Sequence, residues 1–132
     1  MKLWALGFLG GAVVLAAAPV AMAHHSFAMF DTKKTIVLNG TIKEFQWTNP
    51  HSWVQINAAG PDGKVVEWSI EMGSPNMLSR NGWRPSTLKP GDKVELVTNP
   101  MKDGSAGGAM VKITVPDGRV FMGPGGMPES KG

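Results

Sequence analysis

Residues 35–46 read TIVLNGTIKEFQ, and this stretch decides the fold class. β-Branched residues are frequent in it, and apolar residues roughly alternate with polar ones, which is typical of a β-strand. Gly40 stands in its middle, where a strand glycine often marks a bulge or a sharp coil. We therefore expect one long, bent first strand over Lys34–Gln46.

Two further strands are predicted directly after it. Alternate apolar residues fall on one face of Trp53–Ala59, which is the pattern of a half-buried strand. The turn sequence Gly60-Pro61-Asp62-Gly63 joins it to a third strand over Lys64–Glu71. The two strands are expected to form a hairpin.

A short helix is predicted after the third strand. Ser74 is a typical N-cap, Pro75 is a typical first helical residue, and Gly82 is a typical stop signal. We expect this helix to run from Pro75 to about Asn81. Further strands are predicted over Lys93–Thr98, Ala109–Val115 and Arg119–Met122.

The order of these elements predicts a mainly β domain. Three strands, a short helix and then two or three strands match the OB-fold, a small Greek-key barrel of five to six strands with a helix between strands three and four. Two packed sheets or another small barrel would satisfy the same pattern. We expect an N-terminal arm over residues 24–33, the barrel over 34–122 and a disordered tail over 123–132.

The first 23 residues have the features of an export signal. Lys2 supplies the positive start, an apolar run follows, and Ala21-Met22-Ala23 forms an A-x-A cleavage site. An uncleaved N-terminal anchor is the alternative. We therefore predict a cleaved chain that begins at His24 and works in the periplasm or outside the cell.

The composition excludes several kinds of site and partner. The chain has no cysteine, which excludes disulfides, zinc–thiolate sites and cysteine nucleophiles. Its formal net charge is +3. This bias is too small to indicate nucleic acid as a partner. The expected partners are a metal ion, a small ligand, or a periplasmic or membrane-bound protein.

Several motifs resemble those of a bacterial exported family, the domain of unknown function number 6152. They are HHSFAMFD (24–31), GTIKEFQWTNPHSW (40–53) and WSIEMGSPNML (68–78), followed by GW (82–83) and LKPGD (88–92). These motifs are distributed over residues 24–92. The resemblance implies export and a small β domain, and it implies no activity.

A looser similarity is to the periplasmic copper chaperones of copper and silver efflux systems. Trp68, Met72, Met77 and the LKPGDKV turn (88–94) carry this similarity. It implies an OB barrel that binds Cu(I) through a histidine, two methionines and a tryptophan. The spacing of the ligands does not match closely, and a shared fold does not establish a shared function.

The histidines suggest a copper site on chemical grounds. Cleavage after Ala23 would give His24 a free α-amine, which can form a chelate ring with its own Nδ1. His51 is the only histidine far enough along the chain to complete a nitrogen set, and His25 is a weaker candidate. Nitrogen ligands of this kind suit Cu(II). In the alternative interpretation His24 and His25 are solvated and His51 caps the Asn-Pro turn.

Met72 and Met77 are the softer candidates. Thioethers favour Cu(I), and we expect both side chains to lie beside Trp68. The alternative is that both methionines fill the core, which is the commoner role of this residue. The predicted metal ligands are therefore His24, His25, His51, Met72 and Met77, with copper as the cofactor.

Tryptophans suggest a second kind of binding site. Trp47 and Trp53 flank an irregular turn that contains Asn49, and exposed aromatic residues often anchor interfaces. Alternatively, one of these tryptophans closes an end of the barrel and the other covers it. Trp68 and Trp83 are expected in the core or at its rim. The candidate binding residues for a partner without metal are Trp47, Asn49, Trp53 and Trp68.

No catalytic residues are predicted. Ser52 follows His51 directly, and neighbours on an extended chain point to opposite faces, so they do not form a nucleophile–base pair. Glu67 and Glu71 share a strand face, and we expect both to be solvated. The sequence therefore favours a binding protein over an enzyme.

Overall fold

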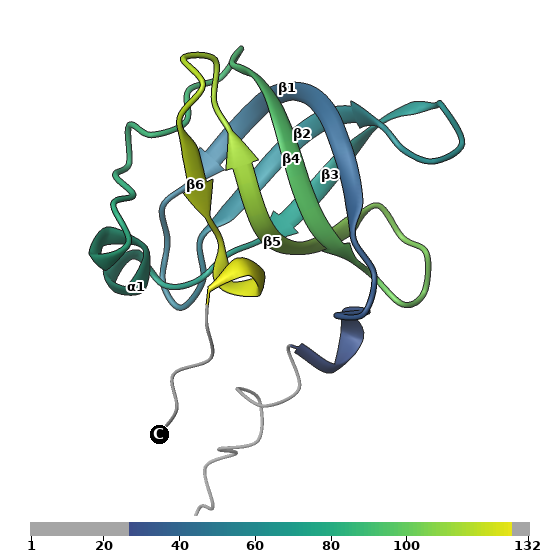
Figure 1. Ribbon diagram of the computed structural model, residues 1–132, viewed down its shortest axis with the longest axis horizontal. Coiled ribbons are helices and arrows are strands. Elements are labelled where there is room, and N and C mark those ends of the chain that lie inside the picture. Colours follow the sequence, from purple (N-terminus) through teal and green to yellow (C-terminus); the bar gives the residue numbers. More distant parts are fainter. Residues whose placement is uncertain (1–26, 128–132) are drawn as a thin grey trace, which may run out of the picture.

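The computed structural model describes residues 27–127, which form six strands, one α-helix and two 3₁₀ helices (Figure 1). Along the chain these elements are η2 (Phe27–Met29), β1 (Ile36–Gln46), β2 (Trp53–Ala59), β3 (Val65–Glu71), α1 (Pro75–Arg80), β4 (Lys93–Pro100), β5 (Gly107–Thr114), β6 (Val120–Met122) and η3 (Pro124–Gly126). The long first strand and the helix between strands three and four confirm the predicted order.

The strands close into an OB-like barrel. Their order is β3-β2-β1-β4-β5-β6, and a parallel pairing of β3 with β5 joins the two sides. Ser69, Ile70 and Glu71 pair there with residues 107–109. β6 adds a short sixth strand at the edge of β5 (Figure 1). The structure therefore confirms a mainly β, Greek-key barrel of five strands plus one.

β1 pairs with two strands: its first half pairs with β4 and its second half pairs with β2. Gly40 belongs to both pairings, and a Cβ there would collide with the Asn57 carbonyl oxygen. The glycine therefore permits the close approach of β2. The register shift itself lies later, between Ile42 and Glu44. The bent strand is confirmed, while Gly40 has a packing role in place of a bulge.

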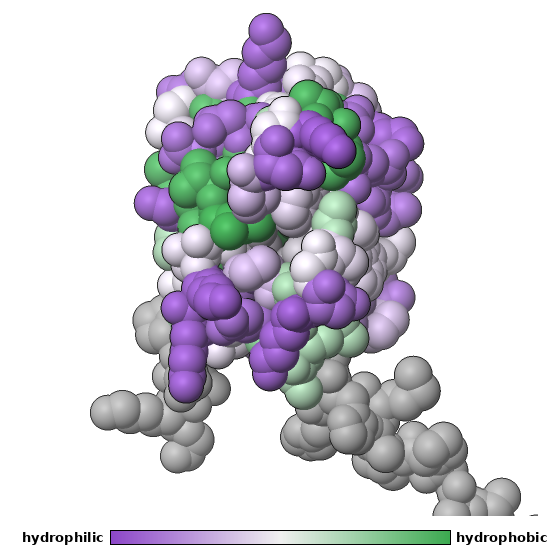
Figure 2. Space-filling model, turned by 90° about the vertical axis from the view of Figure 1, so that its right-hand side faces the viewer, coloured by the Kyte–Doolittle hydropathy of each residue, from purple (hydrophilic) through white to green (hydrophobic). Residues whose placement is uncertain are grey.

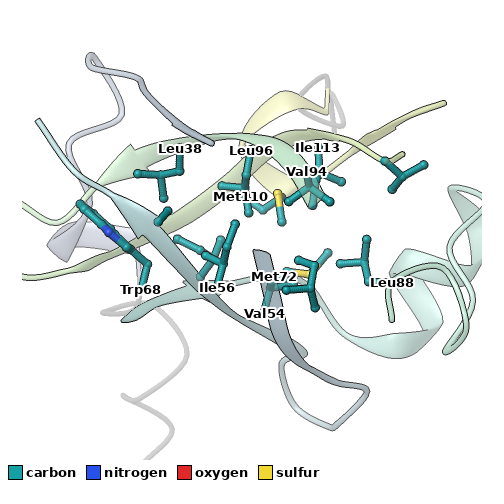
Figure 3. Packing of buried hydrophobic residues seen from close by; sticks show 14 of the residues in the cluster. Leu38, Val54, Ile56, Trp68, Met72, Leu88, Val94, Leu96, Met110 and Ile113 are labelled. Carbon is teal, nitrogen blue, oxygen red and sulfur yellow. The ribbon is translucent and has the colours of Figure 1, made fainter. Parts of the chain in front are cut away.

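The barrel interior holds one apolar core (Figure 3). Leu38, Ile56, Leu96 and Met110 are fully buried in it. Burial of each such side chain stabilises the fold by about 1.5–3 kcal/mol. The predicted core placement of Trp68 and Trp83 is confirmed, because the two residues are 6% and 0% exposed.

Helix α1 begins where the sequence predicts. The Ser74 hydroxyl oxygen accepts a hydrogen bond from the Met77 amide at 3.2 Å, and Pro75 occupies the first turn. Leu78 is fully buried and attaches the helix to the core. The last helical residue is Arg80, so the helix ends one residue earlier than expected.

Residues 123–127 do not behave as the expected disordered tail. The Gly123 amide donates to the Val111 carbonyl at 2.8 Å, and Gly123 is buried. Gly123 has no side chain, and a Cβ there would overlap Met110. The backbone of Gly123 can therefore approach Met110 of β5 closely, and this allows η3 to lie against β5 (Figure 1).

The N-terminal arm is described from Phe27 onward, and Phe30 in it is buried and bridges to Met101. The predicted export signal over residues 1–23 lies outside the described residues, as do His24 and His25. Among residues 27–127, no helix has the length and apolar character needed to cross a bilayer.

Candidate functional site

A groove of about 650 Å³ lies at the end of the barrel that carries α1. It is bordered by the turn before β2, the end of β3, α1, and both ends of the described chain. Its lining residues are Phe27, Pro50, His51, Met72, Gly73, Ser74, Met77, Asn81, Pro124 and Met127. The groove thus brings together residues that are far apart in the sequence.

The turn that carries His51 is fixed by its backbone. Ser52 donates its amide to the Gly73 carbonyl and accepts from the Met72 amide, both at 2.9 Å. The Thr48 hydroxyl donates to the His51 carbonyl at 2.7 Å. The peptide bond between Asn49 and Pro50 is cis. The hydrogen bonds of Ser52 to Met72 and Gly73 hold His51 beside the end of β3.

The imidazole of His51 has a defined hydrogen-bonding environment. Its Nδ1 lies 3.0 Å from the Met72 carbonyl oxygen and 3.3 Å from Oε1 of Glu71. A carbonyl oxygen only accepts, so Nδ1 carries the proton and Nε2 carries the lone pair in the neutral ring. The side chain is 34% exposed. Histidines that do bind metal commonly donate their second ring N–H to a carbonyl or a carboxylate in this way.

Glu71 differs from the sequence prediction. Its side chain is only 10% exposed, whereas we expected it in solvent. The reason is the barrel closure, because Glu71 pairs with Trp53 of β2 on one side and with Ala109 of β5 on the other. This neighbourhood buries the carboxylate beside the His51 ring.

Glu67, on the same strand, is exposed as predicted. It forms an ion pair with Lys43 in which Oε2 lies 2.6 Å from Nζ. The hydrogen bond to Glu67, and then its charge, raise the pKa of Lys43 above the usual value. Glu67 has no neighbour from β5, because the parallel pairing begins only at Ser69.

The two candidate methionines line the groove with His51 but in different ways. Met72 is 1% exposed and belongs to the core, which matches the core-filling alternative. Met77 is half-buried, and its methyl group packs on Gly73 so closely that a Cβ there would overlap it. Neither lies beside Trp68 as expected, because Trp68 and Met72 lie toward opposite ends of the barrel (Figure 3).

Met127 also lines the groove, and the sequence analysis did not select it. Its position depends on the packing of η3 against β5, which no local pattern predicts. Of the five predicted metal ligands, His51, Met72 and Met77 therefore share one groove, and His24 and His25 precede the described residues. Within residues 27–127, no group of three or more histidine, aspartate or glutamate side chains is arranged to hold a metal ion.

The sequence motifs are explained by a family match. The sequence model described as "Family of unknown function (DUF6152)" matches residues 12–110, which is more than half of the chain. The chain belongs to this family. No curated protein matches it. A mitochondrial single-stranded DNA binding protein of S. cerevisiae, Rim1, is similar in structure with 15% identity and a TM-score of 0.44, over 63% of this chain and 94% of that protein.

A second, smaller pocket of this DUF6152 chain lies on the other side of Glu71. It measures about 200 Å³ and is lined by Met29, Phe30, Trp53, Ser69, Glu71, Met101, Ser105, Ala106, Gly107 and Gly108. Trp53 is thus directed away from the core. Trp47 packs on Phe45 with ring centroids 5.7 Å apart, and Asn49 is exposed.

Trp68, the fourth candidate of the predicted partner site, lines a separate pocket with residues 60–62. The four candidates therefore do not form one surface. On the face shown in Figure 2, hydrophilic side chains separate the apolar ones into distinct patches.

Ser52 is fully buried, and its hydroxyl donates to the Thr48 carbonyl at 3.4 Å. The neighbouring His51 directs Nδ1 to Met72 and Glu71. These two side chains therefore do not form a nucleophile–base pair.

Proposed function

We propose that this protein is an exported, non-catalytic protein that binds copper in the groove at His51. The observation that carries the proposal is the hydrogen bond of His51 Nδ1 to the Met72 carbonyl, because it leaves the lone pair on Nε2. Imidazole nitrogen is a good ligand for copper in both of its common oxidation states.

The methionines of the groove support a Cu(I) form. Met77 and Met127 are half-buried at its walls, and Met72 lies at its inner side. Thioether sulfur is soft and prefers Cu(I) to harder cations. Met77 is the strongest thioether candidate, because it lies at the surface of the groove while Met72 is part of the core.

The start of the chain supports a Cu(II) form. Phe27 lines the groove, and His25 and His24 precede it by two and three residues. Each residue spans at most about 3.6 Å, so the covalent chain allows either imidazole to reach His51. Cleavage after Ala23 would add the α-amine of His24 to this nitrogen set.

The test is a copper titration of the exported chain after its N-terminal residue has been measured. Affinities for Cu(II) and Cu(I) are determined by competition with chelators of known strength. We expect His51→Ala to weaken both, His24→Ala to weaken mainly Cu(II), and Met77→Leu to weaken mainly Cu(I). Met29→Leu is the matched control, because Met29 lines the other pocket. Failure of the wild-type protein to bind either ion would refute the proposal.

A second candidate function is recognition of a partner protein or a small ligand without metal. The outward position of Trp53 in the pocket with Phe30 and Met101 favours it. Trp53→Ala should then abolish binding to a partner that His51→Ala still binds. The reverse pattern would favour copper handling.

A further inference from the structure

Glu71 lies beside His51 but is not one of the ligands of the proposed copper site. Its side chain is nine-tenths buried, and its Oε1 lies 3.3 Å from His51 Nδ1. A buried carboxylate is stabilised only when nearby groups compensate its charge, and the His51 ring is one of these groups. Whatever is bound at Nε2 of His51 therefore lies close to a fixed negative charge.

We infer that Glu71 is a positioning residue that makes His51 favour Cu(II) over Cu(I), an inference that rests on the copper site proposed above. Metal-binding histidines commonly donate their second N–H to a carbonyl or a carboxylate, which orients the ring and strengthens it as a ligand. Here Nδ1 faces both kinds of acceptor, the Met72 carbonyl and the Glu71 carboxylate. The carbonyl fixes the ring, and the carboxylate adds charge.

The charge of the bound ion decides how much Glu71 contributes. A metal ion about 2 Å from Nε2 would lie roughly 7 Å from the carboxylate oxygen. The attraction is proportional to the charge of the ion, so Cu(II) gains twice as much as Cu(I). With an effective dielectric constant of about 20, and with screening of a ring that is 34% exposed, this difference corresponds to about tenfold in relative affinity.

The thioethers of the groove act in the opposite direction. Met77 and Met127 are uncharged and soft, and they favour Cu(I). Glu71 would therefore balance them, so that one groove accepts both oxidation states. Removal of the carboxylate charge should shift the balance toward Cu(I).

The deciding experiment compares Glu71→Gln with Glu67→Gln. Both glutamates lie on β3, but Glu67 is exposed and pairs with Lys43. Affinities for Cu(II) and Cu(I) are measured by chelator competition. We expect the ratio of the Cu(II) to the Cu(I) affinity to fall about tenfold in Glu71→Gln and to stay unchanged in Glu67→Gln. Equal weakening of both ions in Glu71→Gln would show a purely structural role and overturn the inference.

A measurement on the metal-free protein separates this inference from the copper site itself. The Nδ1 proton of His51 is followed by NMR on nitrogen-15-labelled protein. Its resonance should move in Glu71→Gln and stay in place in Glu67→Gln. An unmoved resonance in Glu71→Gln would contradict an effect of the Glu71 carboxylate on the His51 ring. If the wild-type protein binds neither ion, the proposed function fails, and the inference fails with it. If it binds both but the ratio is unchanged, only the inference fails. Glu71→Ala removes the same charge and gives the same test should the glutamine variant not fold.

Discussion

Each end of the barrel is closed by a tryptophan, and the two indoles are bonded differently. Trp83 is fully buried near α1, donates Nε1–H to the Met122 carbonyl at 2.9 Å and contacts the rings of Phe45 and Phe121. Trp68 is 6% exposed at the other end, and its Nε1 has no hydrogen-bond partner within residues 27–127. Of the two tryptophans, the one at the end beside the groove is therefore the more completely bonded.

The largest loss of stability should come from a substitution of Trp83, the better-bonded tryptophan. Trp83→Ala removes a fully buried side chain that contacts two aromatic rings, and such truncations cost about 3–5 kcal/mol. Urea denaturation of the purified protein should show this loss in the free energy of unfolding. A loss below about 1 kcal/mol would mean that the Trp83 end contributes little to stability.

A smaller difference in stability should distinguish the hydrogen-bonded indole N–H of Trp83 from the unpaired one of Trp68. Trp83→Phe loses a hydrogen bond and leaves the Met122 carbonyl without it, whereas Trp68→Phe removes a donor that is already unpaired. Because both substitutions shorten the ring equally, we expect Trp83→Phe to cost about 1–2 kcal/mol more than Trp68→Phe. Equal costs, measured by urea denaturation, would contradict the difference between the two ends.

The helix at the groove end allows a finer test. Ser74→Ala removes the oxygen that accepts from the Met77 amide, and the loss of an N-cap typically costs about 1 kcal/mol. Ser79→Ala is the matched control, because Ser79 is exposed within the same helix and makes no cap. Thermal unfolding should show a loss only in Ser74→Ala.

The smallest effect belongs to the barrel wall between the two ends, where Lys43 and Glu67 form an exposed pair. The raised pKa of Lys43 means that its contribution is complete below the usual lysine pKa and is lost as the pH rises through the raised value. Glu67→Gln should flatten the pH dependence of the unfolding midpoint in the alkaline range. An unchanged alkaline profile would show that the pair does not affect stability.

The strands and the helix were predictable because they depend on local patterns. The alternation in Trp53–Ala59 and the cap at Ser74 gave the correct elements. The spacing of Trp68 from Met72 also held a usable signal, because four residues along a strand span about 13 Å. That distance argues against the placement of both side chains in one site.

The candidate site was less predictable because it depends on contacts that are distant in sequence. The burial of Glu71 follows from its pairing with Ala109, and the position of Met127 follows from the packing of η3 on β5. Neither pairing has a local sequence signal. The sequence identified His51 as a candidate metal ligand and the structure places it in the groove, while its partners at Nδ1 are visible only in the folded chain.

The parallel contact between β3 and β5 is a narrow seam of three residue pairs, and it includes Glu71. The residues that hold the barrel shut are therefore continuous with those that surround the His51 ring. Opening of this seam would expose the Glu71 carboxylate to solvent but leave it beside the imidazole, because the turn of His51 is hydrogen-bonded to Met72 and Gly73 at the end of β3. Hydrogen exchange should show the amide of Ser69, which bonds across the seam to the Ala106 carbonyl, opening independently of the Ser52 and Met72 amides, which hold the turn of His51 to β3.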